Sequence, residues 1–331
     1  MTTETLRNVR LFGTFTLRSP LSHIGEAIST TSYLVEEPIL QPDGEVEPVF
    51  SYSGNAWRGQ LRDLAASYLL DQLGIQRLPL DAFHLLFSGG RIGGEQQVDL
   101  EKARQYRRNI PMLAIFGGGV GNQILPGKLR VSNAYPLCVE ALPVLPEYLL
   151  ERAVNVSYRS LTFEKSFSRK DDSKDDRLNH YAGMGLPEPG QLALLGETEP
   201  TKKREKDGPA DQMRMTAELL AAGSVLYTQI DCLDVTEVEL GALVSALHRF
   251  SRSPHIGGQA NKGHGRVALE YRLLDLDTGE IVDFLRVDDG PSKLAPPAEQ
   301  AKQAYDEFLR LQLDAYLASH QHELRALLGA A

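Results

Sequence analysis

One glycine-rich stretch, residues 254–267, constrains the fold more than any other part of the sequence. It reads Pro-His-Ile-Gly-Gly-Gln-Ala-Asn-Lys-Gly-His-Gly-Arg-Val, with four glycines among the polar side chains of Lys262, His264 and Arg266. Because glycine carries no side chain, such a stretch lets the backbone of a ligand approach closely. The alternative is a helix-to-strand connection in which the glycines serve turn geometry alone.

Regular elements are expected on both sides of this stretch. Thr236 and Glu239 have the spacing of a capping box, and apolar residues at helical spacing follow them. After the stretch, residues 267–273 alternate apolar and polar side chains, as a half-buried strand does. A helix therefore leads into the glycine-rich stretch, and a strand leads out of it.

The N-terminal part of the chain repeats this alternation of strand and helix. Residues 9–18 alternate and predict a strand. A helix is expected to begin after Ser53 or Asn55, with Trp57 on its apolar stripe. Residues 30–50 hold three prolines and an Asp-Gly pair but show no clear period, so we expect a loop there.

Together these elements predict an α+β protein with a modified ferredoxin-like core, the RNA-recognition-type split βαβ plan, with large insertions and a C-terminal helix. We expect residues 1–153 and 216–280 to form this core with helical insertions. Residues 154–215 would be a separate insertion, and residues 281–331 a linker and a C-terminal helix. The linker is expected at residues 283–297. This plan alone does not imply RNA binding.

Composition bounds the class of protein. The 331 residues carry a net charge of −9, which argues weakly against a nucleic-acid partner. However, residues 270–331 hold 12 acidic and 6 basic residues, so a local basic groove elsewhere remains possible. Two cysteines make neither a disulfide framework nor a metal cluster, which fits a reducing cytoplasm. The polar residues 1–8 predict no signal peptide, and no apolar run has membrane-spanning length.

A second glycine run, residues 117–121, follows the apolar residues 112–116. Its spacing is not that of a dinucleotide-binding G-x-G-x-x-G motif. In addition, Pro126 and Gly127 lead to a strand-like segment rather than a helix. We therefore do not expect a dinucleotide site here.

The insertion at residues 154–215 mixes aromatic and cationic side chains. A polar, irregular insertion of this kind is normally a solvated surface excursion. Its pattern is also what a segment lying along a nucleic-acid strand needs. The residues concerned are Phe163, Lys165, Phe167, Arg169, Lys170 and Lys174.

Three segments, taken in order, point to a known family. Residues 19–25 read Ser-Pro-Leu-Ser-His-Ile-Gly, and residues 53–62 read Ser-Gly-Asn-Ala-Trp-Arg-Gly-Gln-Leu-Arg. Residues 218–224 read Glu-Leu-Leu-Ala-Ala-Gly-Ser, and the glycine-rich stretch completes that third pattern. This ordered set resembles the backbone subunit of CRISPR surveillance complexes, in the RAMP superfamily. Among its subgroups, the chain looks most like the type IV backbone protein.

The resemblance implies a non-catalytic subunit of an antiviral or anti-plasmid complex, of which many copies assemble along a guide RNA. The expected partners are CRISPR guide RNA, complementary target DNA or RNA, further copies of the chain and other effector subunits, with no cofactor, metal or membrane. A thumb-like projection, here the six insertion residues named above, would splay a base at intervals. The residues expected to bind RNA are His23, Gly25, Asn55, Trp57, Arg58, Arg62, Gly117, Gly118, Gly257, Gly258, Lys262, His264 and Arg266.

Two alternatives remain open. Type III relatives carry an aspartate, before the helix motif, that cuts target RNA, and the corresponding position falls near residues 41–43. Asp43 is either that acid, acting with a metal and Glu36 or Glu37, or the first half of an Asp-Gly turn, which the sequence favours. The other alternative is a purely structural oligomerisation protein whose glycines only turn the chain.

Overall fold

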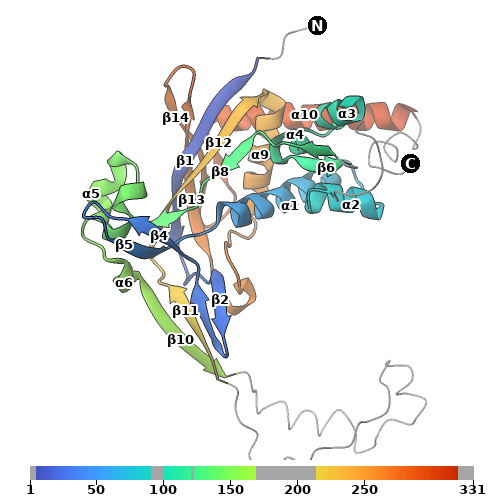
Figure 1. Cartoon of the computed structure of the whole chain (residues 1–331). Helices are drawn as coiled ribbons and strands as arrows, with labels where there is room; N and C mark the ends of the chain where they lie inside the picture. Colours follow the sequence, from blue (N-terminus) through green and yellow to red (C-terminus); the bar gives the residue numbers. More distant parts are fainter. Residues whose placement is uncertain (1–4, 91–99, 121–122, 169–213, 320–331) are drawn as a thin grey trace, which may run out of the picture.

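The structure is a computed structural model that describes residues 5–90, 100–120, 123–168 and 214–319. Its central feature is an antiparallel sheet with β1 (Arg7–Leu17) in the middle (Figure 1). Strand β12 (Val225–Val235) pairs with one edge of β1 and β13 (Val267–Asp275) with the other. The remaining strands of this central sheet are β8 (Leu129–Val131) and β9 (Tyr135–Pro136) beside β12, and β14 (Ile281–Val287) and β15 (Lys293–Leu294) beyond β13.

The order of elements along the chain explains this sheet. Helix α1 (Gly54–Gln72) lies between β1 and β8 in the sequence, and helix α9 (Glu237–Phe250) connects β12 to β13. Strand β12 pairs with β1 on one side and with β8 on the other. These two pairs and the β1–β13 pair are antiparallel. The strands and helices expected around the glycine-rich stretch are confirmed, including both hydrogen bonds of the Thr236–Glu239 capping box.

One layer of helices covers one face of the central sheet (Figure 1). Helix α9 is buried along most of its length because α1, α4 (Pro111–Phe116) and α10 (Pro296–Ser319) surround it. It also approaches α10 closely, since a Cβ added at Gly241 would lie 2.0 Å from the carbonyl oxygen of Ala301. Near these helices lie α2 (Leu80–Phe87), α3 (Leu100–Asn109), β6 (Gly118–Val120) and β7 (Gln123–Leu125).

A second, four-stranded sheet extends away from the body of the molecule (Figure 1). We call it the projecting sheet. Its strands, in order, are β10 (Thr162–Ser168), β11 (Arg214–Leu220), β3 (Thr31–Leu34) and β2 (Ile24–Ile28). Strand β10 and the first residues of β11 belong to the predicted insertion at residues 154–215, and residues 169–213 between them lie outside the described residues.

Two expectations about irregular segments are wrong. Residues 30–50 form strands, because β4 (Glu36–Leu40) and β5 (Val46–Phe50) pair as a two-stranded ribbon. Pro38 lies opposite Pro48 in this ribbon, and a ribbon with two free edges tolerates missing N–H donors. Residues 283–297 are not a linker, since β14 and β15 extend the central sheet there.

A small lobe packs beside the β4–β5 ribbon. It consists of η1 (Val139–Val144), η2 (Glu147–Leu149), α5 (Leu150–Ala153) and α6 (Tyr158–Leu161). Glu140 anchors it by accepting hydrogen bonds from the Ser157 hydroxyl and the Tyr158 backbone N–H, both at 2.8 Å. Within the described part of the chain, no helix combines the length and apolar character needed to cross a membrane.

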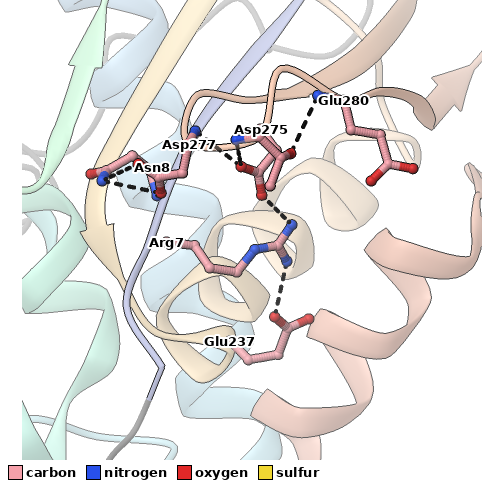
Figure 2. A network of polar contacts seen from close by, with 7 residues as sticks. Arg7, Asn8, Glu237, Asp275, Asp277 and Glu280 are labelled. Carbon is pink, nitrogen blue, oxygen red and sulfur yellow. Dashed lines mark hydrogen bonds and ion pairs between the residues drawn. The ribbon is translucent and has the colours of Figure 1, made fainter.

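A polar network ties the start of β1 to the first turn of α9 (Figure 2). The Arg7 guanidinium lies 3.3 Å from a carboxylate oxygen of Glu237 and 3.3 Å from one of Asp275. Asn8 donates to Asp277 in the β13–β14 turn at 3.2 Å. These contacts are part-exposed, so they add more to the alignment of the three elements than to stability.

Candidate nucleic-acid interface

The three segments that carry the family resemblance meet where the projecting sheet joins the body. Gly258 N–H donates to the Ser22 carbonyl at 2.7 Å, and Gln60 of α1 donates to the His255 carbonyl at 2.7 Å. The Ser53 N–H, at the start of α1, donates to Nε2 of His23 at 3.3 Å. Segments more than 200 residues apart in the sequence are thus brought together around the glycine-rich stretch.

The glycines of this stretch do two different things. Gly257 has φ +71°, and a Cβ there would lie 2.4 Å from the Ser22 carbonyl oxygen. Gly265 has φ +81° and would meet Ile256 at 2.0 Å, so both are required by turn geometry and close packing. Gly258 is exposed, and the nearest atom to its added Cβ is 3.7 Å away. Gly263 is exposed as well, and an added Cβ there would meet no atom within 4 Å, so Gly258 and Gly263 are the positions of this stretch that offer open backbone to a ligand.

A cationic surface joins the glycine-rich stretch to strand β10. Lys262 is exposed, and its Nζ lies 4.1 Å from the centre of the Phe167 ring. Lys165 is exposed on the same strand and is close enough to His264 to influence its titration. We call Gly258, Lys262, Lys165 and Phe167 the loop–β10 surface. Arg266 is exposed too, but Asp289 lies 2.5 Å away and compensates its charge.

The two histidines expected to face RNA are enclosed by protein. His264 is only 5% exposed, and its Nδ1 has no hydrogen-bond partner. Its burial, and then the Lys165 charge, lower the pKa of this ring. His23 is half-buried beside the ring of Tyr52, at 4.9 Å, and burial lowers its pKa as well. His264 therefore cannot stack on a base in this conformation, contrary to expectation.

The buried His264 should make stability depend on pH. Its pKa is lower in the folded chain than the ordinary 6.5, so the unfolded chain binds the proton more tightly. The contribution is fully present above pH 6.5 and is lost as the pH falls below it. We expect urea unfolding at pH 7.5 and 5.5 to show a smaller loss for His264→Gln than for wild type, by up to about 1.4 kcal/mol, the limit set by one pH unit below the ordinary pKa of 6.5. Equal losses would contradict this assignment.

Arg58 and Arg62 turn inward toward the second glycine run. Arg62 is 7% exposed and donates to the carbonyls of Phe116, at 2.6 Å, and Gly117, at 3.1 Å. Half-buried Arg58 donates to the same Phe116 carbonyl. These carbonyls end helix α4, where cations are favoured. Burial, and then the Arg58 charge, lower the pKa of Arg62 to about 10, so it stays charged. Arg62 is therefore a helix-capping residue within the protein.

Trp57 is also inside the protein. Its ring is 1% exposed and packs edge-on against Phe15 and Phe250, at centroid distances of 5.3 and 5.0 Å. Its Nε1–H donates to the hydroxyl of Tyr271 at 3.2 Å. The prediction that Trp57 lies on the apolar stripe of α1 is confirmed. The expected contact of its ring with RNA does not fit the structure, because the ring is buried. Asn55, in the first turn of the same helix, is exposed.

The remaining predicted glycines lie at three places. Gly25 is exposed within β2, and its added Cβ would lie 3.1 Å from the Cα of Val35. Gly117 ends α4 at φ +71°, with Leu125 only 2.5 Å from an added Cβ. Gly118 follows in β6, next to Leu85 and Gly89. Gly117 therefore serves the turn after α4.

The thumb residues divide into two groups. Phe163 is 38% exposed, Lys165 is exposed and Phe167 is half-buried, all on β10. This strand pairs with β11 along its full length, so its partly exposed side chains stand on a regular frame. Arg169, Lys170 and Lys174 lie outside the described residues.

The acids of the ribonuclease alternative are engaged elsewhere. Asp43 accepts from the Glu45 N–H at 3.1 Å in the β4–β5 turn, and Gly44 there has φ +91°. Glu36 accepts from the Tyr158 hydroxyl at 2.7 Å, and Glu37 from Asn133 at 2.6 Å. Among the residues that the structure describes, no three acidic, histidine or cysteine side chains cluster in a way that could hold a metal ion.

Comparison with solved structures bears on the identity of the fold. One match is a chain described as part of a "Type IV-B CRISPR Complex", with a TM-score of 0.54 and 20% identity. The alignment covers 79% of this chain and 90% of that chain. This chain shares the fold of that subunit. No family model and no curated protein matches the sequence. At the level of the fold, the resemblance inferred from the sequence is confirmed.

Two residues that hold the glycine-rich stretch escaped the sequence reasoning. Gln60 lies between Arg58 and Arg62 in the helix motif, but it was not singled out, although it bonds to His255. Tyr52, which precedes the motif, is buried beside His23 and interacts with the Gly257 backbone. The signal for Gln60 is its position between two arginines of the helix motif at residues 53–62. For Tyr52 the sequence offered none.

Proposed function

We propose that this chain is a guide-RNA-binding backbone subunit that oligomerises along CRISPR RNA in a type IV surveillance complex. It would support pairing between guide and target without cutting it. The observation that carries the proposal is the fold shared with a type IV-B complex chain over most of both chains. The partners would be guide RNA, complementary target DNA or RNA, further copies of this chain and other effector subunits.

In this proposal the central sheet and its helices are a modified ferredoxin-like core. The projecting sheet, whose strand β10 and the start of β11 belong to the insertion at residues 154–215, would be part of the thumb that crosses a neighbouring copy's RNA. The pairing of β10 with β11 supports this role, because it holds Phe163 and Phe167 at the edge of a regular platform. Aromatic side chains in such positions stack on bases at about 1–3 kcal/mol per base.

The proposed RNA contacts are a reduced set of those expected from sequence. Lys262 and Lys165 would meet phosphates, and Gly258 would let the RNA backbone lie against the protein. Asn55 and Arg266, both exposed, and the exposed part of half-buried Arg58 complete the set; Arg266 would have to exchange Asp289 for phosphate. Trp57, Arg62 and His264 are left out because they are buried. The sequence of the target would be read by base pairing, with the protein sensing backbone and shape.

The decisive measurement is the salt dependence of RNA binding. Lys262→Gln should weaken binding of unrelated RNA sequences by a similar factor. It should also lower the slope of log affinity against log salt by about 0.7 if Lys262 meets one phosphate of a single strand. Lys293→Gln, which removes an exposed lysine at the far edge of the central sheet, is the matched control. Circular dichroism would verify that both variants are folded. Identical slopes for wild type and Lys262→Gln would remove this residue from the interface.

The ribonuclease alternative has less support. Asp43 occupies a turn of the kind that Asp-Gly pairs favour, and its carboxylate caps a backbone N–H there. Glu36 and Glu37 accept hydrogen bonds from other elements. A shared reaction centre for these three acids therefore has no geometric support in the described structure.

A further inference from the structure

A second site is suggested by a cavity of about 490 Å³ at the end of the molecule away from the projecting sheet. It lies between the end of α3, the first turn of α9 and one face of α10. The glycine-rich stretch follows the opposite end of α9, and the 14 residues of that helix span about 21 Å. The cavity is therefore separate from the loop–β10 surface, and the proposed function does not use it.

The frame of the cavity is fixed by polar contacts. Lys128 places its Nζ 2.6 Å and 2.8 Å from the two carboxylate oxygens of Glu239, so these opposite charges compensate each other. Glu239 also accepts from the Thr236 N–H at 2.8 Å. Gln312 of α10 donates to the Asn109 carbonyl at the end of α3, at 2.8 Å. Beside the cavity, Arg7 holds the first turn of α9 through Glu237 (Figure 2).

Among the described residues, two arginines on this wall have no carboxylate partner. Arg107 donates to the Pro126 carbonyl, a neutral acceptor, and its Nε is buried without a hydrogen-bond partner. Arg108 is exposed and has no hydrogen-bond or ion-pair partner within the described parts of the chain. Both line the cavity next to the already neutralised Lys128–Glu239 pair. The cavity therefore presents two guanidinium groups to whatever enters it.

Apart from Thr236, the rest of the lining is apolar. Pro111, Val238 and Phe308 contribute side chains from α4, α9 and α10. A volume of this size, lined by apolar side chains together with charged and polar groups, is typical of small-molecule sites. Guanidinium groups match the oxygens of a phosphate in paired hydrogen bonds, while an aromatic ring such as Phe308 suits a flat base.

We propose that this cavity binds a phosphomonoester carried on a flat apolar group, that is, a nucleoside monophosphate, either free or at the 5′ end of a nucleic acid. A phosphomonoester is preferred to a carboxylate because two guanidinium groups suit a dianion with three terminal oxygens, whereas a carboxylate is satisfied by one. The Lys128–Glu239 pair would remain intact and form the floor beneath the phosphate.

Calorimetric titration of the full chain with adenosine monophosphate tests the proposal. Arg108→Gln should weaken binding about tenfold or more, since a charge-assisted hydrogen bond is lost without touching the frame of the cavity. Arg104→Gln is the matched control, because Arg104 lies on the same helix, is exposed and pairs with Glu101 at 2.6 Å. It should leave binding unchanged. Failure of the wild type to bind, or equal affinities for wild type and Arg108→Gln, would overturn the proposal.

A second titration separates the two sources of the ligand. Dinucleotides with and without a 5′ phosphate should differ in affinity for wild type, and the difference should vanish in Arg108→Gln. Tighter binding of the phosphorylated dinucleotide than of the free nucleotide identifies a nucleic-acid end; the reverse identifies a free nucleotide. An acidic peptide that binds in place of the monophosphate would refute the assignment. Because Arg108 lies outside the loop–β10 surface, its variant should keep the salt slope for RNA that ends in a 5′ hydroxyl, so with that RNA the two proposals fail independently.

Discussion

Replacing Trp57 with alanine is expected to remove about 3–5 kcal/mol from the free energy of unfolding. The ring is 1% exposed, and it fills the space between β1 and α9 through edge contacts with Phe15 and Phe250. Alanine would leave a large cavity there, and the Tyr271 hydroxyl would lose a donor. Urea denaturation of the purified chain, monitored by far-ultraviolet circular dichroism, measures the loss.

Trp57→Phe is the control that separates packing from surface function. It keeps an aromatic ring and gives up the hydrogen bond to Tyr271, a loss of about 1 kcal/mol for a hydrogen bond of this kind. At a temperature where the variants are folded, RNA affinity should equal that of wild type. A Trp57→Phe variant with full stability but weakened RNA binding would return this ring to the interface and contradict the structure.

Those parts of the fold that depend on local interactions could be predicted from the sequence. The capping box of α9 is one example, because Thr236 and Glu239 exchange hydrogen bonds across three residues. The alternation of β1 and β13 is another, since each strand has one face against the helices. The β4–β5 ribbon was missed because its prolines end most strands, and they are accommodated only by the ribbon's free edges. No local sequence pattern indicates that these two segments pair with each other and leave both outer edges free.

The sequence predicted which segments form the candidate site, but not which of their side chains face outward. Residues 19–25, 53–62 and 254–267 were singled out together, and the structure joins them through Ser22, His23 and Gln60. Which side chains face outward depends on what packs around them. A helix enclosed on more than one side buries polar positions as well as its apolar stripe, and an arginine facing a helix end has the same sequence signature as one facing solvent.

Arg62→Ala is expected to cost about 2–4 kcal/mol of unfolding free energy while leaving the salt slope of RNA binding unchanged. Arg62 supplies charged donors to the Phe116 and Gly117 carbonyls, which the variant would leave in a buried position with fewer partners. The unfolding free energy of Arg62→Lys should fall between those of wild type and Arg62→Ala. A lysine ammonium keeps the charge but cannot reproduce the planar fork of an arginine.

Arg58→Ala, one turn earlier on α1, is the comparison that decides the role of this pair. Arg58→Ala should lower the free energy of unfolding by less than about 1 kcal/mol, since Arg58 is half-buried and the Phe116 carbonyl would keep its hydrogen bond from Arg62. If the exposed part of Arg58 meets an RNA phosphate, its variant alone should lower the salt slope, by about 0.7 for a single strand. Should Arg62→Ala instead keep its stability and lower that slope, Arg62 would be a phosphate-binding residue, and its inward position would not be the one used on RNA.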